Sequence, residues 1–152
     1  MQNLLLWSRD WSGCYKMKNF LILLLFLSVG FSQQNGPYKS YYENGKLKEE
    51  GTYKYDEKDG PWKTYYENGQ LKTERTYKNG EWEGPFKSYY ENGQLSGEGT
   101  YKDGKLDGPY KSYYENGQLW NEGTWKDGKE VGVFTRYFRN GNIEVQRTYL
   151  DE

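Results

Sequence analysis

The stretch Gly84–Asp107, with the sequence GPFKSYYENGQLSGEGTYKDGKLD, contains the pattern that recurs through most of this chain. Glycines that open the same phrase follow one another at a constant step, at Gly36, Gly60, Gly84, Gly108 and Gly132. The pentapeptide YYENG is repeated without change from Tyr41, Tyr65, Tyr89 and Tyr113, and the fifth copy, from Tyr137, has become YFRNG. Self-similarity at a fixed period of this length is typical of repeat architectures, in which each unit is one small structural element.

Each unit carries two turn signals. An Asn-Gly pair follows the tyrosines in all five units, as at Asn92-Gly93, and a second Asn-Gly or Asp-Gly pair lies later in three of them, at 79–80, 103–104 and 127–128. Such pairs favour type I′ hairpin turns, because both central residues of that turn have positive φ. The first unit has Tyr55-Asp56 at the second position, which predicts a looser connection there. Two turns per unit predict an antiparallel meander of about ten strands over residues 36–150.

A two-residue turn at Asn92-Gly93 places Phe86 opposite Gly99 and Lys87 opposite Glu98. Because side chains alternate between the two faces of a strand, the register predicts one aromatic and one charged face. The aromatic face is expected to collect Trp82, Phe86, Tyr90, Leu95 and Tyr101. The charged face is expected to collect Lys87, Tyr89, Glu91, Glu98 and Thr100. Lysine opposite glutamate recurs in four units, and each such pair stabilises a sheet by about 0.2–1 kcal/mol.

Small and charged residues interrupt the aromatic pattern at defined positions. Glycine lies opposite the first ring of the hairpin at Gly51, Gly99 and Gly123, where it leaves room for a ring to lie across the backbone. Arg75 and Arg147 replace it opposite Trp62 and Phe134, which predicts cation–π stacking. Prolines follow the unit glycines in four units and predict a bulge or a bend there. Arginines gather in the last unit, an arrangement that would blunt an exposed sheet edge with charge: Arg136, Arg139 and Arg147.

Residues 1–32 do not belong to the repeat and are interpreted as a leader. A basic start at Met17-Lys18, an apolar core over 20–29 and small residues at Gly30 and Ser32 are typical of a secretory signal peptide, with Met17 as the true start. The apolar core is shorter than the ~20 residues of an ordinary membrane span. An exported protein, in the periplasm, at the cell surface or secreted, with no stable membrane span after cleavage, is therefore expected. Anchoring by an uncleaved leader is the alternative.

The predicted organisation is a leader over 1–32, a short linker over 33–35 and five repeat units. The units cover 36–59, 60–83, 84–107, 108–131 and 132–152. After residue 32 the chain has few aliphatic residues but 16 Tyr, 4 Trp and 3 Phe, enough for one aromatic layer. The predicted fold class is all-β: tandem 24-residue β-hairpin repeats that form an elongated single-layer antiparallel meander, preceded by a signal helix.

Composition excludes most catalytic chemistry. The chain has no histidine, and its one cysteine, Cys14, lies in the leader, so a nucleophile activated by such a base is not expected. Acidic residues recur beside turns, where solvated charges are expected, and their spacing does not match a calcium loop. Cleavage after Ser32 would remove Arg9, Lys16, Lys18 and Asp10 and change the net charge from −1 to −3. Interleaved charges of both signs argue against nucleic-acid binding, and we expect no enzyme activity, cofactor or metal.

One feature stands out as a candidate site, a stripe of tyrosines with one member per hairpin. We predict that this tyrosine stripe lies on the charged face and binds a partner. Its members are Tyr41, Tyr65, Tyr89, Tyr113 and Tyr137. The alternative is that these rings only pack over lysine and glutamate side chains.

The segments GPWKTYYENGQLK, from Gly60, and GTYKDGKLDG, from Gly99, resemble the MORN-variant repeat, and the resemblance covers residues 36–152. Tandem copies are similar to the bacterial YwqK-type family, which is described as antitoxins of toxin–antitoxin systems. The resemblance implies a β-hairpin repeat scaffold that binds a partner protein, with a toxin as one such partner, in an antitoxin or immunity-like role. A second function class stays open, a cell-surface glycan- or wall-binding module, because short aromatic hairpin repeats also occur in choline-binding-type domains.

Overall fold

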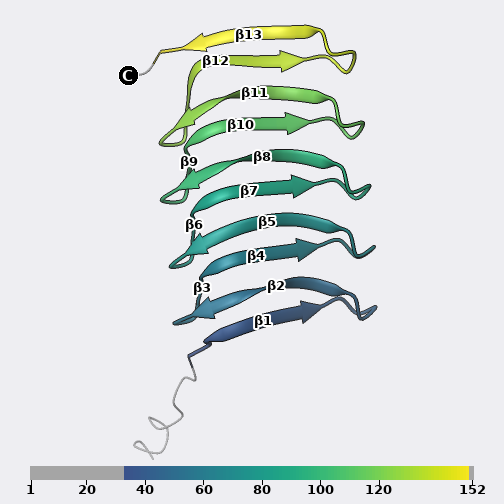
Figure 1. Ribbon diagram of the computed structural model, residues 1–152, viewed down its shortest axis with the longest axis vertical. Coiled ribbons are helices and arrows are strands. Elements are labelled where there is room, and N and C mark those ends of the chain that lie inside the picture. The colour runs from purple at the N-terminus through teal and green to yellow at the C-terminus, as the bar shows by residue number, and fades with distance from the viewer. Residues whose placement is uncertain (1–32, 151–152) are drawn as a thin grey trace, which may run out of the picture. The chain divides into compact units, whose positions relative to one another are not determined.

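The computed structural model describes residues 33–150, which form one open antiparallel sheet of 13 strands (Figure 1). Ten strands follow one another along the sheet in the order β1-β2-β4-β5-β7-β8-β10-β11-β12-β13, and three short strands pair beside this path. The predicted meander is therefore confirmed, and residues 33–150 contain no helix. The expected leader and signal helix fall in residues 1–32, outside the described part.

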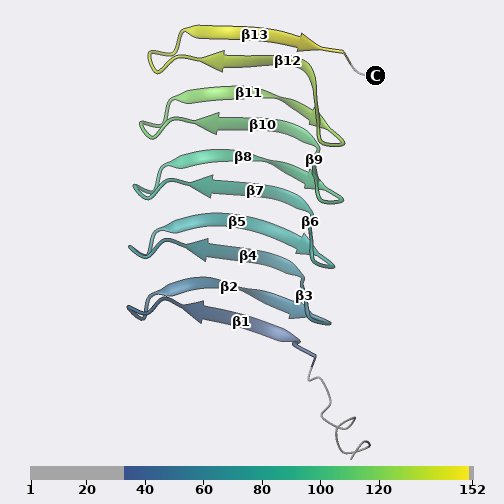
Figure 2. The ribbon, with the colours of Figure 1, turned by 180° about the vertical axis from the view of Figure 1, so that it is seen from behind.

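The strand bounds repeat with the period of the sequence. The first hairpin strands of the units are β1 (Gly36–Tyr41), β4 (Gly60–Tyr65), β7 (Gly84–Tyr89), β10 (Gly108–Tyr113) and β12 (Lys129–Tyr137). The second hairpin strands are β2 (Leu47–Lys54), β5 (Leu71–Lys78), β8 (Leu95–Lys102), β11 (Leu119–Lys126) and β13 (Ile143–Tyr149). The short strands are β3 (Glu57–Lys58), β6 (Glu81–Trp82) and β9 (Lys105–Leu106). Seen from behind, all YYENG-type turns lie at one end of the strands and all second turns at the other (Figure 2).

The predicted register holds through the middle of each hairpin. Phe86 pairs with Gly99 and Lys87 with Glu98. The equivalent positions pair in the same register in the other units. Lys–Glu ion pairs form in three of the four predicted places, with Nζ–Oε distances of 3.2 Å, 3.2 Å and 3.5 Å. All of these pairs are partly exposed, so each contributes little on its own.

The prediction of a type I′ turn at YYENG is wrong. In the YYENG turn of the third unit only Gly93 has positive φ, at 82°. Its N–H donates to the Tyr90 carbonyl oxygen (2.9 Å), and the Tyr90 N–H donates to the Gln94 carbonyl oxygen (2.8 Å). This is a type I turn closed by a glycine bulge, the usual form of a three-residue hairpin loop. Asn92 favours it because its side-chain Oδ1 accepts the Gln94 N–H (2.9 Å).

The bulge moves one side chain to the other face of the sheet. Tyr89 pairs with Leu95, where a two-residue turn would have paired it with Ser96. Leu95 therefore lies on the charged face beside Tyr89, and its predicted place on the aromatic face is wrong. The same shift occurs in every unit, just before the first YYENG-type tyrosine.

The second turns do adopt the type I′ form. Asp103 and Gly104 have φ of 48° and 75°, and the other Asn-Gly and Asp-Gly pairs are alike. The first unit, for which a looser connection was predicted, makes the same turn with Tyr55 and Asp56, at 53° and 68°. Asn35 holds it, because its Oδ1 accepts the Tyr55 N–H (2.7 Å).

The predicted bend between units is confirmed. The glycine before each proline has positive φ, as at Gly84 (83°), and only two residue pairs join neighbouring hairpins such as β5 and β7. Proline has no N–H donor, so it is tolerated at this position, where the hydrogen-bonded ladder between neighbouring hairpins has ended. In the last unit Val133 replaces proline, and β12 runs without a break from Lys129 to Tyr137.

Rings lie over the glycines of the aromatic face, as predicted, but at Gly51 and Gly123 the ring comes from the next unit and not from the same hairpin. A Cβ on Gly51 would lie 2.0 Å from the Trp62 ring, and one on Gly123 would lie 2.1 Å from the Phe134 ring. Trp62 is accordingly only 2% exposed. The predicted stacking of Arg75 on Trp62 is wrong, because the Arg75 guanidinium lies over the ring of Trp82, 4.3 Å from its centroid.

Candidate functional site

The tyrosine stripe connects each unit to the one before it. The hydroxyls of Tyr65, Tyr89, Tyr113 and Tyr137 donate to glutamate carboxylates of the preceding unit, over 2.7 Å, 3.1 Å, 2.8 Å and 2.6 Å. Their rings are half-buried, whereas Tyr41, which has no preceding unit, is 59% exposed. The stripe therefore offers ring faces to a partner along its length, but an unbonded hydroxyl only at Tyr41 among the residues that the structure describes.

These hydrogen bonds help to raise the pKa of the tyrosines, and at Glu50 the bond also lowers the pKa of the carboxyl. Burial, followed by the hydrogen bond to Glu50, raises the pKa of Tyr65 to about 12. The same hydrogen bond, with Lys39 beside it, lowers the pKa of the Glu50 carboxyl. Burial and the bond to Glu98 likewise raise the pKa of Tyr113 to about 12. A neutral tyrosine against a charged carboxylate is thus the stable arrangement between units.

A second row of tyrosines bonds in the opposite direction along the array. The hydroxyls of Tyr42, Tyr66, Tyr90 and Tyr114 donate to the backbone carbonyl of the first YYENG-type tyrosine in the next unit, over 2.6 Å, 2.7 Å, 2.6 Å and 2.7 Å. These tyrosines lie at the turn end of the hairpins, where the ladder between units is absent. Tyr90 was predicted to belong to the aromatic packing, but the bond that its hydroxyl makes is this bridge to the next hairpin.

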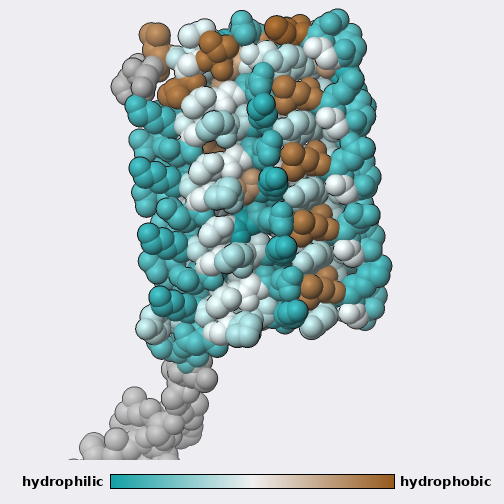
Figure 3. Space-filling model, in the orientation of Figure 1, coloured by the Kyte–Doolittle hydropathy of each residue, from teal (hydrophilic) through white to brown (hydrophobic). Residues whose placement is uncertain are grey.

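The charged face carries an apolar column beside the tyrosine stripe. Leu71 pairs with Tyr65, and Leu95 with Tyr89, because of the bulge in each unit. The space-filling view shows hydrophobic side chains in a column along the sheet, next to a column of hydrophilic ones (Figure 3). Most members are half-buried, and Ile143 in the last unit is 56% exposed.

The opposite face is covered by an aromatic row of eleven rings. Most ring centroids lie 4.7–6.5 Å from a neighbour in tilted, stacked or edge-to-face contact. The row consists of Tyr38, Tyr53, Trp62, Tyr77, Trp82, Phe86, Tyr101, Tyr110, Trp125, Phe134 and Tyr149. Only Trp62 and Phe86 are buried, since no second layer of residues 33–150 covers the row.

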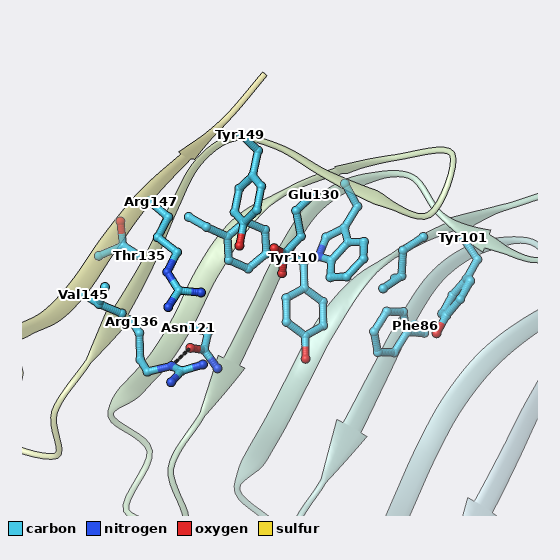
Figure 4. Close-up of a pocket in the computed structure, with 13 residues that line it drawn as sticks. Phe86, Tyr101, Tyr110, Asn121, Glu130, Thr135, Arg136, Val145, Arg147 and Tyr149 are labelled. Atoms are coloured by element: carbon cyan, nitrogen blue, oxygen red, sulfur yellow. Dashed lines mark hydrogen bonds between the residues drawn. The ribbon is translucent and has the colours of Figure 1, made fainter. Parts of the chain in front are cut away.

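The C-terminal end of the aromatic row is hollowed into a cavity of about 550 Å³ (Figure 4). Arg136 and Arg147 project into it from β12 and β13. Six rings of the row line it: Phe86, Tyr101, Tyr110, Trp125, Phe134 and Tyr149. Near it, the indole Nε1 of Trp125 is buried and has no hydrogen-bond partner in the described chain. The sequence predicts Arg147 opposite Phe134 and edge protection by both arginines, whereas the structure shows that Arg136 and Arg147 line one cavity together.

The described residues hold no group of three or more His, Cys, Asp or Glu side chains placed to bind a metal ion. Within the same residues, no helix is long and apolar enough to cross a membrane.

A family model described as MORN repeat variant matches five stretches of the chain, which together cover more than half of it: 34–55, 58–79, 82–103, 106–127 and 130–151. The chain belongs to the MORN repeat variant family. The matched MORN copies follow one another at the constant step of the sequence, and the first four end within a second turn. MORN repeats are generally non-catalytic modules that contact proteins or membranes. A comparison with curated proteins gives no match.

Proposed function

We propose that this MORN repeat protein is a non-catalytic scaffold that binds a partner protein across its aromatic row. One observation carries the proposal: nine of the eleven rings remain partly exposed on a sheet that has no second layer in the described chain. Large contiguous apolar surfaces of this kind mark interaction sites in soluble proteins. Tyrosine, tryptophan and arginine are also the residues that most often dominate the binding energy of protein interfaces.

The mixed charges around the row favour a protein over an anionic surface. Lys58 and Arg75 stack on ring faces, but Glu49 accepts the Trp62 indole N–H (3.2 Å) and Glu130 lies at the cavity. A surface that alternates in sign matches a partner with its own alternating charges, which gives specificity more than raw affinity.

The tyrosine stripe on the opposite face is a second proposed contact surface, because its rings and the leucine column form a half-exposed apolar band. We further propose that the protein is exported and that it has an antitoxin or immunity-like role toward a toxin. These two proposals rest on the leader and on the family resemblance.

The repeat offers matched variants that separate the two faces. Each second hairpin strand contains a threonine followed by a ring of the aromatic row, and the two side chains point to opposite faces. Tyr77→Lys with Tyr149→Lys adds two charges to the aromatic row, whereas Thr76→Lys with Thr148→Lys adds the same charges one residue away on the charged face.

The test is capture of proteins from an extract of the organism that encodes the chain, followed by their identification. We expect one protein to be retained by the wild type and by the threonine variant but not by the tyrosine variant, with all three folded by circular dichroism. Loss with the threonine variant alone would assign binding to the charged face. Retention of polysaccharide in place of protein would contradict the proposal and favour a glycan-binding module.

A further inference from the structure

The fifth unit departs from the repeat at two positions beside the aromatic row. Arg136 stands where the third and fourth units have Ser88 and Ser112. Arg147 stands where these units have glycine, Gly99 and Gly123. The second unit has an arginine, Arg75, at the position of Arg147, but the third and fourth units fold with the smaller residues at both positions, so the hairpin itself does not require the two arginines.

The register brings the two arginines together. Phe134 pairs with Arg147, and Arg136 pairs with Val145, so the arginines occupy diagonal positions on neighbouring strands. Diagonal neighbours on one face have Cα atoms about 7–8 Å apart, within reach of long side chains. Both side chains extend into the cavity on the same side, beside Asn121 (Figure 4). The Arg136 Nε donates to the Asn121 Oδ1 (3.2 Å), which orients the group and leaves its terminal nitrogens for another acceptor.

The two guanidinium groups are not neutralised by the described chain. Within residues 33–150 neither forms an ion pair with a carboxylate. The acidic side chain that lines the cavity is Glu130, and the other ionisable groups there are Tyr101, Tyr110 and Tyr149. With neutral tyrosines the cavity therefore carries one net positive charge. Two cations on one face with a single acid repel each other, and an anion between them would relieve this repulsion.

We infer that this cavity binds an aspartate or glutamate side chain of the partner protein, together with an apolar residue next to it. Paired guanidinium groups present planar forks of N–H donors that match a carboxylate. The rings of Trp125 and Phe134 supply an apolar wall for the neighbouring residue. Glu130 disfavours a doubly charged phosphate more than a singly charged carboxylate. The inference rests on the proposed function, since it names the group by which the partner is anchored.

The experiment compares two blocked dipeptides that differ only in charge, acetyl-Phe-Glu-amide and acetyl-Phe-Gln-amide, titrated into the full chain and followed by NMR. We expect the glutamate peptide to bind about tenfold more tightly, as a charge-assisted bond to a fork of donors allows. The signals that move should include the side-chain N–H groups of Arg136, Arg147 and Trp125. Added salt should weaken only the glutamate peptide, because its advantage is electrostatic.

The control variant is Arg136→Ser with Arg147→Gly, which restores the residues of the third and fourth units and is expected to keep the fold. It should bind both peptides equally. Equal binding of the two peptides to the wild type, or a preference that survives in the variant, would overturn the inference. Arginine-dependent binding of phosphatidylserine vesicles without a preference for the glutamate peptide would overturn it in favour of a membrane. If the Arg136/Arg147 variant still captures the partner while the Tyr77/Tyr149 variant does not, the proposed function is supported and the binding of a partner carboxylate in this cavity is refuted.

Discussion

Removing the hydroxyls of the second tyrosine row should loosen the array without disturbing its packing. The triple variant Tyr66→Phe, Tyr90→Phe and Tyr114→Phe keeps every ring but deletes three hydroxyl donors. Each hydroxyl bonds a backbone carbonyl of the next unit over 2.6–2.7 Å, at the end of the hairpins where no ladder joins the units.

The cost follows from the hydrogen bonds that are lost. A net hydrogen bond contributes about 0.5–1.5 kcal/mol, so the triple variant should lose about 3 kcal/mol of unfolding free energy. Equivalent positions lie two strands apart, about 10 Å, so the three losses should add with little coupling. A typical domain is stable by about 5–15 kcal/mol, and the loss is therefore a large share of the total.

The assay is urea denaturation followed by circular dichroism. Tyr41→Phe is the control, because its hydroxyl has no hydrogen-bond partner within residues 33–150, and it should change stability by less than about 0.5 kcal/mol. The denaturation midpoint should fall for the triple variant with an unchanged slope. A control as destabilised as a single member of the row, or a triple variant as stable as the wild type, would refute the assignment of the row as the bridge between units.

Three further predictions follow from the same structure. Gly93→Val should lower the free energy of unfolding by about 1 kcal/mol or more, because this position of the turn has positive φ. Lys87→Ala on the exposed face should lower it little. The urea midpoints of the two variants compare these losses, and equal losses would show the turn assignment to be wrong. The pKa values of Tyr65 and Tyr113 are raised to about 12 from 10, so these tyrosines contribute fully to stability below pH 10, and the contribution is lost as the pH rises towards 12. The double variant Tyr65→Phe with Tyr113→Phe should show a smaller fall in unfolding free energy over this range, measured by denaturation at a series of alkaline pH values. Deletion of residues 84–107 should leave a folded four-unit sheet with a lower thermal midpoint, and a chain that no longer gives a β-type circular dichroism spectrum would contradict the equivalence of the units.

The fold could be predicted because each unit of the sequence carries turn-forming residues at the same positions. A constant step with two turn signals per unit allows only a meander, and the pairing of Lys87 with Glu98 follows by counting from the turn. The form of that turn could not be predicted in the same way. Asn-Gly suits both type I′ and a type I turn with a glycine bulge, and the side-chain bond of Asn92 decides between them. The place of Leu95 on the charged face depends on that choice.

The site was less predictable because it depends on how one unit is offset against the next. Tyr65 reaches Glu50, and Tyr66 reaches the Tyr89 carbonyl, over sequence separations of 15 and 23 residues. Neither separation equals the repeat period, so the repeat does not reveal these contacts. The place of Arg147 opposite Phe134 could be predicted by counting from the turn, but the cavity that Arg136 and Arg147 share is seen only in the structure.

The most direct test of the central claim, that the aromatic row is the contact surface, is the accessibility of single tryptophans in the complex. Trp82 and Trp125 belong to the row and are half-buried, whereas Trp120 lies at the turn end and is 40% exposed. Variants that keep one tryptophan can use residues found at equivalent positions, such as Tyr for Trp125 and Leu for Trp82. With the captured partner bound, acrylamide should quench the fluorescence of Trp82 and Trp125 less than in the free chain, and that of Trp120 as before. Unchanged quenching at both row positions in a saturated complex would contradict the claim.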